Sequence, residues 1–243
     1  MEINLSNFVK KDYPFTYYIF DNFLNEDIAR KLESEFPDYN SNVWYEYNNP
    51  VENKKALNSW YHFPPATYQF MEYLNSSVVV SQFERLTNVA PLYPDFGLHG
   101  AGWHVQGNGG LLNVHLDYAL HPKTFQKRKM NLIIYLSDWE KEWGGNLELW
   151  THDTESNKPK ELGAIVECKF NRAVLFDASM NSWHGFSNAI ACPKGKLRKS
   201  IAMYYHTDSD ESDTRKRALY APRKEQEDQK EVLEFIQQRV MLR

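Results

Sequence analysis

Cysteine is scarce in this chain of 243 residues, because only Cys168 and Cys192 occur. One pair of cysteines in a chain of this size gives little support for a secreted, disulfide-stabilised protein. No stretch reaches the roughly 20 apolar residues needed to span a bilayer. The first residues also lack the uninterrupted apolar run of a signal peptide. These absences predict a cytoplasmic protein with no membrane partner.

An excess of charge of one sign is also missing. The net charge is −4, and 25% of the residues are charged. Nucleic-acid-binding domains usually carry a strongly basic face or segment. The sequence therefore predicts no nucleic-acid partner, and no pattern in it predicts an oligomeric state.

Aromatic residues, in contrast, are plentiful, with 15 Tyr, 14 Phe and 7 Trp. Flat rings pack well on pleated surfaces, so this content suits a β-rich core with a deep pocket. Internal repeats and clear linkers are missing, which favours one domain over residues 1–243. We expect it to comprise an N-terminal helical part (about 1–97), a core (about 98–207) and a C-terminal tail (about 208–243).

Helix signals occur near both ends of the chain. Asn25 is a suitable N-cap for a helix that ends near Glu35, since acidic residues follow it in the first turn. We also predict helices over about Pro65–Leu74 and Val79–Thr87, and a C-terminal surface helix over Lys224–Val240. The aromatic and polar segment Trp44–Trp60 is expected to form a recognition lid.

The middle of the chain consists of short apolar runs separated by turn residues. Such a succession without long intervening helices indicates a sandwich or barrel. The expected strands are Leu111–Asp117, Met130–Leu136, Asn146–Thr151, Ala164–Phe170, Ala173–Phe176, Trp183–Ser187 and Ser200–Tyr205.

One constellation in this region can bind a metal. His115 and Asp117 are two residues apart in a predicted strand, so their side chains point to the same face. His184 follows on a later strand. Two imidazoles and one carboxylate, with the remaining positions open, are typical of Fe(II) sites that activate dioxygen. His206-Thr-Asp208 repeats the first half of the pattern, but no histidine follows it.

Three stretches that contain these residues resemble Fe(II)/2-oxoglutarate-dependent dioxygenases of the prolyl-hydroxylase-like branch. They are GAGWHVQGNGGLLNVHLDYALHPKT, RKMNLIIYLSDWEKEWGGNLELW and SWHGFSNAIACPKGKLRKSIAMYYHT. The opening YYIFDNFLNEDIARKLESEFP is also similar. The resemblance implies a mainly β fold in which a double-stranded β-helix (jelly-roll) core is flanked by N-terminal helices. It does not extend to the last thirty-odd residues, where the C-terminal helix is expected from the sequence alone.

The resemblance also implies the cofactors and the residues that bind them. Fe(II) is expected at His115, Asp117 and His184, with 2-oxoglutarate and dioxygen as co-substrates and ascorbate as an accessory reductant. Arg198 is expected to bind the distal carboxylate of 2-oxoglutarate, since a guanidinium matches a carboxylate in two parallel hydrogen bonds. Tyr135, Ser200 and Asn131 are expected beside it. The long stretch after His184 leaves Lys196 and Lys199 as alternatives to Arg198.

The reaction implied is hydroxylation of an unactivated C–H bond with release of succinate and CO2. The substrate is either a prolyl or other residue of a protein or a small metabolite, and the sequence leaves both open. Arg128, His104, Gln106 and Asn113 are the candidate substrate contacts, with an exposed loop arginine as the alternative for Arg128. Two other functions also remain, a cupin-like metal enzyme that does not use 2-oxoglutarate and a catalytically silent jelly-roll binding domain.

Overall fold

The computed structural model describes residues 2–178, 181–210 and 215–241. Its α-helices are α1 (Glu26–Ser34), α2 (Pro65–Leu74), α3 (Ser77–Thr87) and α4 (Lys230–Met241). Short 3-10 turns occupy Trp60–His62, Lys141–Trp143 and Lys224–Gln226. The strands are β1 (Phe8–Lys11), β2 (Tyr17–Phe20), β3 (Tyr45–Asn49), β4 (Glu52–Leu57), β5 (Tyr93–Pro94), β6 (Gly102–Gln106), β7 (Leu111–Leu116), β8 (Lys127–Tyr135), β9 (Leu147–Asp153), β10 (Lys158–Val166), β11 (Arg172–Asp177), β12 (Trp183–Phe186), β13 (Arg198–Thr207) and β14 (Leu219–Tyr220).

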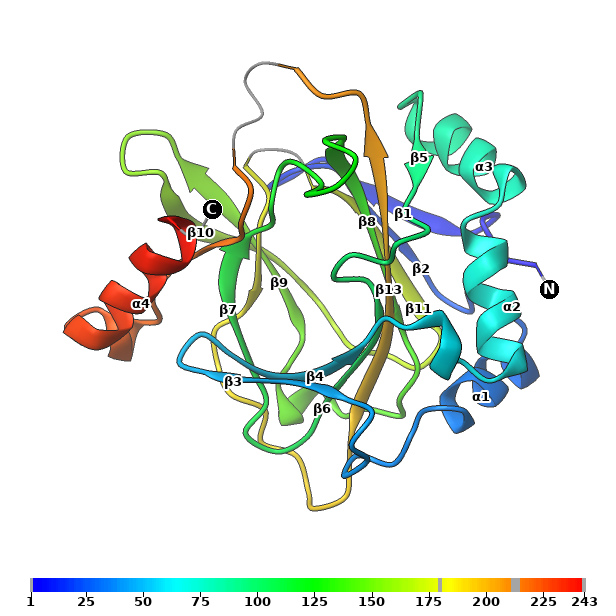
Figure 1. Cartoon of the computed structure of the whole chain (residues 1–243), viewed down its shortest axis with the longest axis horizontal. Coiled ribbons are helices and arrows are strands. Elements are labelled where there is room, and N and C mark those ends of the chain that lie inside the picture. Colours follow the sequence, from blue (N-terminus) through cyan, green and yellow to red (C-terminus); the bar gives the residue numbers. More distant parts are fainter. Residues whose placement is uncertain (1, 179–180, 211–214, 242–243) are drawn as a thin grey trace.

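The strands form one curled antiparallel sheet (Figure 1). Its order is β1-β2-β11-β8-β13-β6-β4-β7-β12-β9-β10, while β3 pairs with β4, β5 with β13 and β14 with β7. Neighbours in space are mostly distant in sequence, as in a jelly roll, where strands cross between two facing halves. The predicted mainly β jelly-roll core with flanking helices is therefore confirmed.

The N-terminal helices pack together on one side of this sheet (Figure 1). Asn25 caps α1, because its side-chain oxygen accepts hydrogen bonds from the backbone N–H groups of Asp27 and Ile28. Phe70 and Leu74 of α2 and Phe83 of α3 are fully buried. The ring of Phe83 meets Tyr205 of β13 at 5.3 Å, so these helices cover the apolar outer face of the sheet.

The C-terminal part lies on the opposite side of the molecule from α1–α3 (Figure 1). It was predicted as one surface helix over Lys224–Val240, but a 3-10 turn and then α4 occur instead. Val232 and Ile236 of α4 are buried against Val51 and Tyr220. The prediction of a solvated surface helix is therefore wrong for the buried face of α4, because apolar residues from distant segments cover this face.

The segment predicted as a recognition lid forms the β3–β4 hairpin. β4 pairs with β6 and with β7, so the hairpin belongs to the main sheet. The predicted division of the chain into three parts, with boundaries at about residues 97 and 207, stays a prediction. β4 of the first part and β14 of the last part both pair with strands of the central part. None of the described helices is long and apolar enough to cross a membrane.

Candidate active site

Three potential metal donors meet where β7 and β12 pair. His115 of β7 lies directly opposite His184 of β12 in the ladder, and their ring centroids are 4.4 Å apart. Asp117 follows the end of β7. One donor atom from each of the three residues lies within 4.8 Å of the others, and the described ranges contain no second group of this kind.

Hydrogen bonds fix both imidazoles in the orientation that a metal requires. Nδ1 of His115 lies 2.9 Å from the carbonyl oxygen of Asn113, and Nδ1 of His184 lies 2.8 Å from that of Ser182. A carbonyl can only accept, so each Nδ1 donates, and Nε2 is the ring nitrogen that remains for a metal. The two Nε2 atoms face Asp117, at 3.5 Å from Oδ1 and 3.4 Å from Oδ2 respectively. Burial, followed by the charge of His115, lowers the pKa of His184 to about 4. Two imidazoles and one carboxylate thus form a donor set that fits Fe(II).

The Asp117 carboxylate has two further partners on β8. Its Oδ2 accepts a hydrogen bond from Asn131 Nδ2 at 2.7 Å and lies 3.1 Å from Arg128 Nη2. Arg128 Nε donates to Asn131 Oδ1 at 2.7 Å, which closes the group. Burial alone raises the pKa of Asp117, but the Arg128 guanidinium and the imidazoles outweigh it and hold the pKa well below its usual range.

The surroundings of Arg128 and Asn131 therefore differ from those that were predicted from the sequence. Arg128 is 3% exposed, lies in β8 and stacks on the Tyr204 ring at 3.3 Å. The alternative of an exposed loop arginine is wrong, because Asp117 and Tyr204 supply a buried charge partner and a ring face. Asn131 was expected beside the 2-oxoglutarate carboxylate, whereas both ends of its amide are bonded within the Asp117 group.

Arg198, at the start of β13, is a buried cation without a carboxylate partner among the described residues. Its Nε donates to the carbonyl oxygen of Gly145 at 2.8 Å and lies 3.1 Å from Cys168 Sγ. Its Nη1 donates to Gln106 Oε1 at 3.2 Å. A guanidinium that is buried in this way lacks the counter-ion that buried charges normally have. Arg198 thus fits an anionic ligand.

Two polar side chains accompany Arg198. The hydroxyl of Tyr135 is buried and makes no hydrogen bond with the described residues, while its ring lies 5.0 Å from the guanidinium carbon. Ser200, which is buried, pairs with Tyr135 across the β13–β8 ladder. A buried hydroxyl without a partner is costly unless a ligand satisfies it.

Lys196 and Lys199 do not share this position. Lys199 Nζ donates to the carbonyl oxygen of Glu33 in α1, as expected from the alternation of side chains along a strand. Lys196 lies over the ring of Trp143 at 5.8 Å. Of the three candidates, Arg198 alone lines the cavity described next.

A cavity of about 840 Å³ contains the three donors, Arg198 and Ser200. Of the predicted substrate contacts, His104 and Arg128 line it. Gln106 and Asn113 do not line it, so their role as substrate contacts stays a prediction without support from this cavity. Gln106 is buried behind Arg198, and Asn113 donates to Gln226 Oε1 at 2.7 Å and thereby anchors the C-terminal part.

The C-terminal part and the β3–β4 hairpin also line the cavity. Sequence reasoning missed the contribution of the C-terminal part, whereas the hairpin lies in the segment expected to form a recognition lid. Tyr220 of β14, Glu52 and Lys54 of β4, and Arg239 of α4 all face it. Tyr220 belongs to a strand of two residues, and Glu52 and Arg239 are 187 positions apart along the chain. A local pattern could not have shown that these residues meet.

Comparisons with known proteins give one family match and several structures with a similar fold. Residues 101–206 match the family model of the 2OG-Fe(II) oxygenase superfamily, whereas no curated protein matches the chain. A prolyl-4-hydroxylase from Pseudomonas putida has a similar structure, with 14% identity, a TM-score of 0.56, and coverage of 79% of this chain and 93% of that chain.

Two further solved structures have the same fold. One is a prolyl hydroxylase from Trichoplax adhaerens in complex with a hypoxia inducible factor peptide fragment (20% identity, TM-score 0.54, coverage 78% and 83%). The other is HygX from Streptomyces hygroscopicus with nickel, 2-oxoglutarate and hygromycin B bound (11% identity, TM-score 0.53, coverage 79% and 82%). At these identities the likeness concerns the fold.

Proposed function

We propose that this chain, of which residues 101–206 match the family model of the 2OG-Fe(II) oxygenase superfamily, hydroxylates an unactivated C–H bond of its substrate. The enzyme uses Fe(II), 2-oxoglutarate and dioxygen. One observation carries the proposal: Arg198 is a buried cation without a carboxylate partner in the described chain, and it shares a cavity with three converging metal donors. Bound Fe(II) with 2-oxoglutarate supplies an oxidant that can cleave a C–H bond, with succinate and CO2 as by-products.

The chain's own residues hold this chemistry in place. His115, Asp117 and His184 bind the metal. Asn131 and Arg128 occupy Oδ2 of Asp117, which leaves Oδ1 as the better donor and makes the carboxylate rigid. Such outer contacts typically change metal affinity about 10–100-fold when they are removed.

Arg198 binds the distal carboxylate of 2-oxoglutarate, and the Tyr135 hydroxyl donates to the same group. Gly145 and Gln106 hold the guanidinium in one orientation before the ligand arrives. Ser200, on the same face of β13, supplies a further hydroxyl. This arrangement supports a 2-oxoglutarate enzyme over a cupin-like enzyme, which needs no buried cation there, and over a silent binding domain.

For the substrate, we propose a small molecule. Solved structures of this fold are bound to a peptide fragment in one case and to hygromycin B in another, so the fold leaves both classes open. The cavity of about 840 Å³ falls in the range of small-molecule sites, about 300–1,000 Å³. The β3–β4 hairpin and the C-terminal part both contribute side chains to it, which encloses a ligand more than an open groove does.

Anaerobic ultraviolet–visible titration tests the assignment. Fe(II) and 2-oxoglutarate are added to metal-free protein, alongside the variants His184→Ala and Arg198→Ala. We expect a weak visible charge-transfer band that requires both additions and is lost in His184→Ala. In Arg198→Ala, the 2-oxoglutarate concentration that gives half of the band should rise about 30-fold or more, since removing one partner of a buried charge pair costs about 2–5 kcal/mol.

Lys199→Ala is the matched control, because this neighbouring cation points to the other face of β13. It should behave as the wild type. If iron binds to the wild type but no band forms, the 2-oxoglutarate assignment fails and a cupin-like enzyme or a silent domain becomes the better description.

A further inference from the structure

The cavity carries more positive than negative charge. Among the described side chains that line it, six are cationic and three are carboxylates. The cations are Lys54, Arg128, Arg198, Lys216, Arg217 and Arg239. Each carboxylate already has cationic partners, because Asp117 contacts Arg128 and Glu46 contacts Lys55, which lies outside the lining.

The third carboxylate, Glu52, is shared by two cations. It is 1% exposed and lies 2.7 Å from Arg239 Nη2 and 3.4 Å from Lys54 Nζ. It also accepts a hydrogen bond from the Tyr220 hydroxyl at 3.1 Å. Burial alone raises the pKa of Glu52, but Lys54 and Arg239 outweigh it and lower the pKa, so the group is ionised. One negative charge therefore faces two positive charges, and the group keeps an excess of one positive charge.

Both cations have room for another ligand. Lys54 and Arg239 are 17% and 27% exposed, and both line the cavity. Lys54 Nζ lies 4.9 Å from the Tyr47 ring centroid, and the Arg239 guanidinium lies 4.9 Å from that of Tyr220. An ammonium has three donors and a guanidinium five, so the contacts with Glu52 leave most of them unused.

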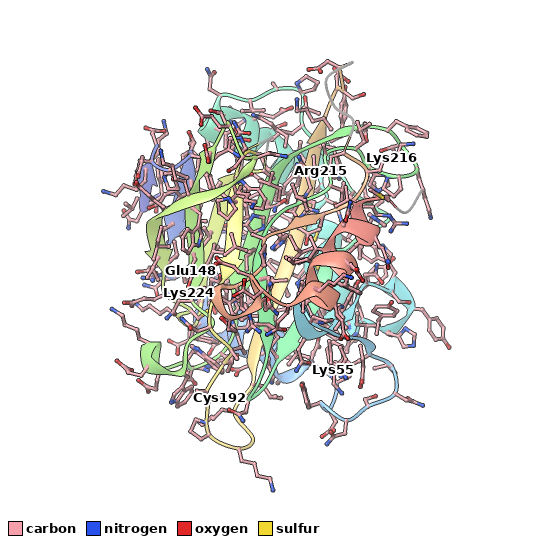
Figure 2. All side chains as sticks on the ribbon, turned by 90° about the vertical axis from the view of Figure 1, so that its left-hand side faces the viewer. Lys55, Glu148, Cys192, Arg215, Lys216 and Lys224 are labelled. Atoms are coloured by element: carbon pink, nitrogen blue, oxygen red, sulfur yellow. The ribbon has the colours of Figure 1, made fainter. Side chains whose placement is uncertain are left out.

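Neighbouring groups do not cancel this charge. Burial, and then the Lys54 ammonium, lowers the pKa of His104 to about 3, so this imidazole on the cavity wall is neutral. Lys216 and Arg217 are exposed at the rim and add further positive charge. In Figure 2, α4 lies across the front of the molecule, with Lys216 above it and Lys55 below it.

We propose that Lys54 and Arg239 form an anion-binding subsite, and that the substrate is a small molecule whose carboxylate or phosphate group binds there. This inference rests on the proposed oxygenase function, because the subsite shares its cavity with the metal donors. Arg239 comes from α4 and Lys54 from the β3–β4 hairpin, both outside the region that matches the family model. The candidate metal donors and Arg198 thus lie within the region that matches the family model, and the two subsite residues lie outside it.

Binding of matched small probes tests the subsite without turnover. The holoprotein is loaded with Mn(II) and saturating 2-oxoglutarate under anaerobic conditions, so that Arg198 is occupied. Inorganic phosphate, benzoate, phenyl phosphate and the neutral benzamide are then titrated by calorimetry. We expect the three anions to bind and benzamide to bind at least tenfold more weakly. Comparing benzoate with phenyl phosphate distinguishes a carboxylate-bearing from a phosphate-bearing substrate.

Two substitutions of neighbouring lysines supply the control. Lys54→Met should weaken anion binding about tenfold, in line with about 1.4 kcal/mol for a charged contact, and Lys54→Arg should restore it. Lys55→Met should leave binding unchanged, because Lys55 contacts the Tyr39 carbonyl and Glu46 and does not line the cavity. Arg239→Gln should also weaken binding, with circular dichroism to verify that α4 persists.

Several outcomes would overturn the subsite. These are no anion binding to the wild type, equal binding of benzoate and benzamide, or equal effects of Lys54→Met and Lys55→Met. An acidic hexapeptide that binds more tightly than the small anions, through Lys54, would contradict a small-molecule substrate. The charge-transfer band separates the two proposals, because it depends on Arg198 and not on Lys54. A missing band with Lys54-dependent anion binding would reject the oxygenase function alone.

Discussion

The ring of Tyr220 stacks on the ring of His115, with centroids 5.1 Å apart and planes inclined by 21°. The two residues are also partners in the β14–β7 ladder. On its other side Tyr220 donates its hydroxyl to Glu52. A candidate metal donor is thus held from one side by a segment more than a hundred residues away in sequence.

Replacing Tyr220 should loosen the metal site. Tyr220→Ala removes the ring that packs on His115, and we expect metal affinity to fall about tenfold, as for other groups that orient metal-binding histidines. Mn(II) titration of the metal-free protein measures this. Tyr220→Phe keeps the ring and should retain most of the affinity. Equal affinity in Tyr220→Ala and the wild type would show that the stack does not hold the imidazole.

Arg128 should matter for folding as well as for the site. Arg128→Met leaves the Asp117 carboxylate without its cation, and breaking a buried pair in this way costs about 3–5 kcal/mol. Urea denaturation of the metal-free protein should show this loss in the free energy of unfolding. Lys10→Met, which breaks the exposed pair with Asp12, should cost below about 1 kcal/mol. Similar losses of unfolding free energy in Arg128→Met and Lys10→Met would contradict the prediction that a buried ion pair costs more to break than an exposed one.

Gly185 allows the strands of the two histidines to approach. Its φ is +154°, and a Cβ there would lie 2.7 Å from the carbonyl oxygen of Asn113 on β7. Gly185→Ala should therefore push β12 from β7 and abolish tight metal binding. Gly195→Ala is the control, since its Cβ would meet no atom within 4 Å, and it should cost only about 1 kcal/mol from its left-handed φ. Metal titration of both variants checks the difference.

His206 should make stability depend on pH. Burial, and then the nearby charges of Arg128, His121 and His99, lowers its pKa from 6.5 to about 3. At pH values between about 3 and 6.5, the His206 side chain is protonated in the unfolded chain but neutral in the folded chain. The free energy of unfolding should thus fall as pH decreases below 6.5, by up to about 1.4 kcal/mol per pH unit for this group. His206→Phe should lack this part of the slope in denaturation curves at pH 4–7. Identical slopes would refute the prediction.

The spacing of potential donors in the sequence singled out three residues that lie close together in the structure. The sequence contains two H-x-D patterns, and only the pattern of His115 and Asp117 is followed by a further histidine. The structure brings these two residues together with His184. His206, in the other pattern, is buried beside Tyr118 and His121. Alternation along β13 also separated Arg198 from Lys199, since a period of two is a local property of any strand.

Contacts between distant segments were beyond such reasoning. Gln106 and Asn113 lie near the donors in sequence, but their side chains bond to Arg198 and Gln226 instead of facing the cavity. Conversely, Glu52 and Arg239 reach the cavity through strand pairing and helix packing that have no signature in the sequence. The charged C-terminal tail was predicted to form a helix, but its sequence did not show that one face of this helix packs against Val51.

The order of the site elements along the chain bears on how the protein is made. A ribosome completes β7 and β12, with all three candidate metal donors, before it reaches the segment from residue 215 onwards. Tyr220, which stacks on His115, and Arg239, which pairs with Glu52, belong to this later segment. The candidate metal donors are therefore synthesised before the C-terminal residues that complete the cavity wall.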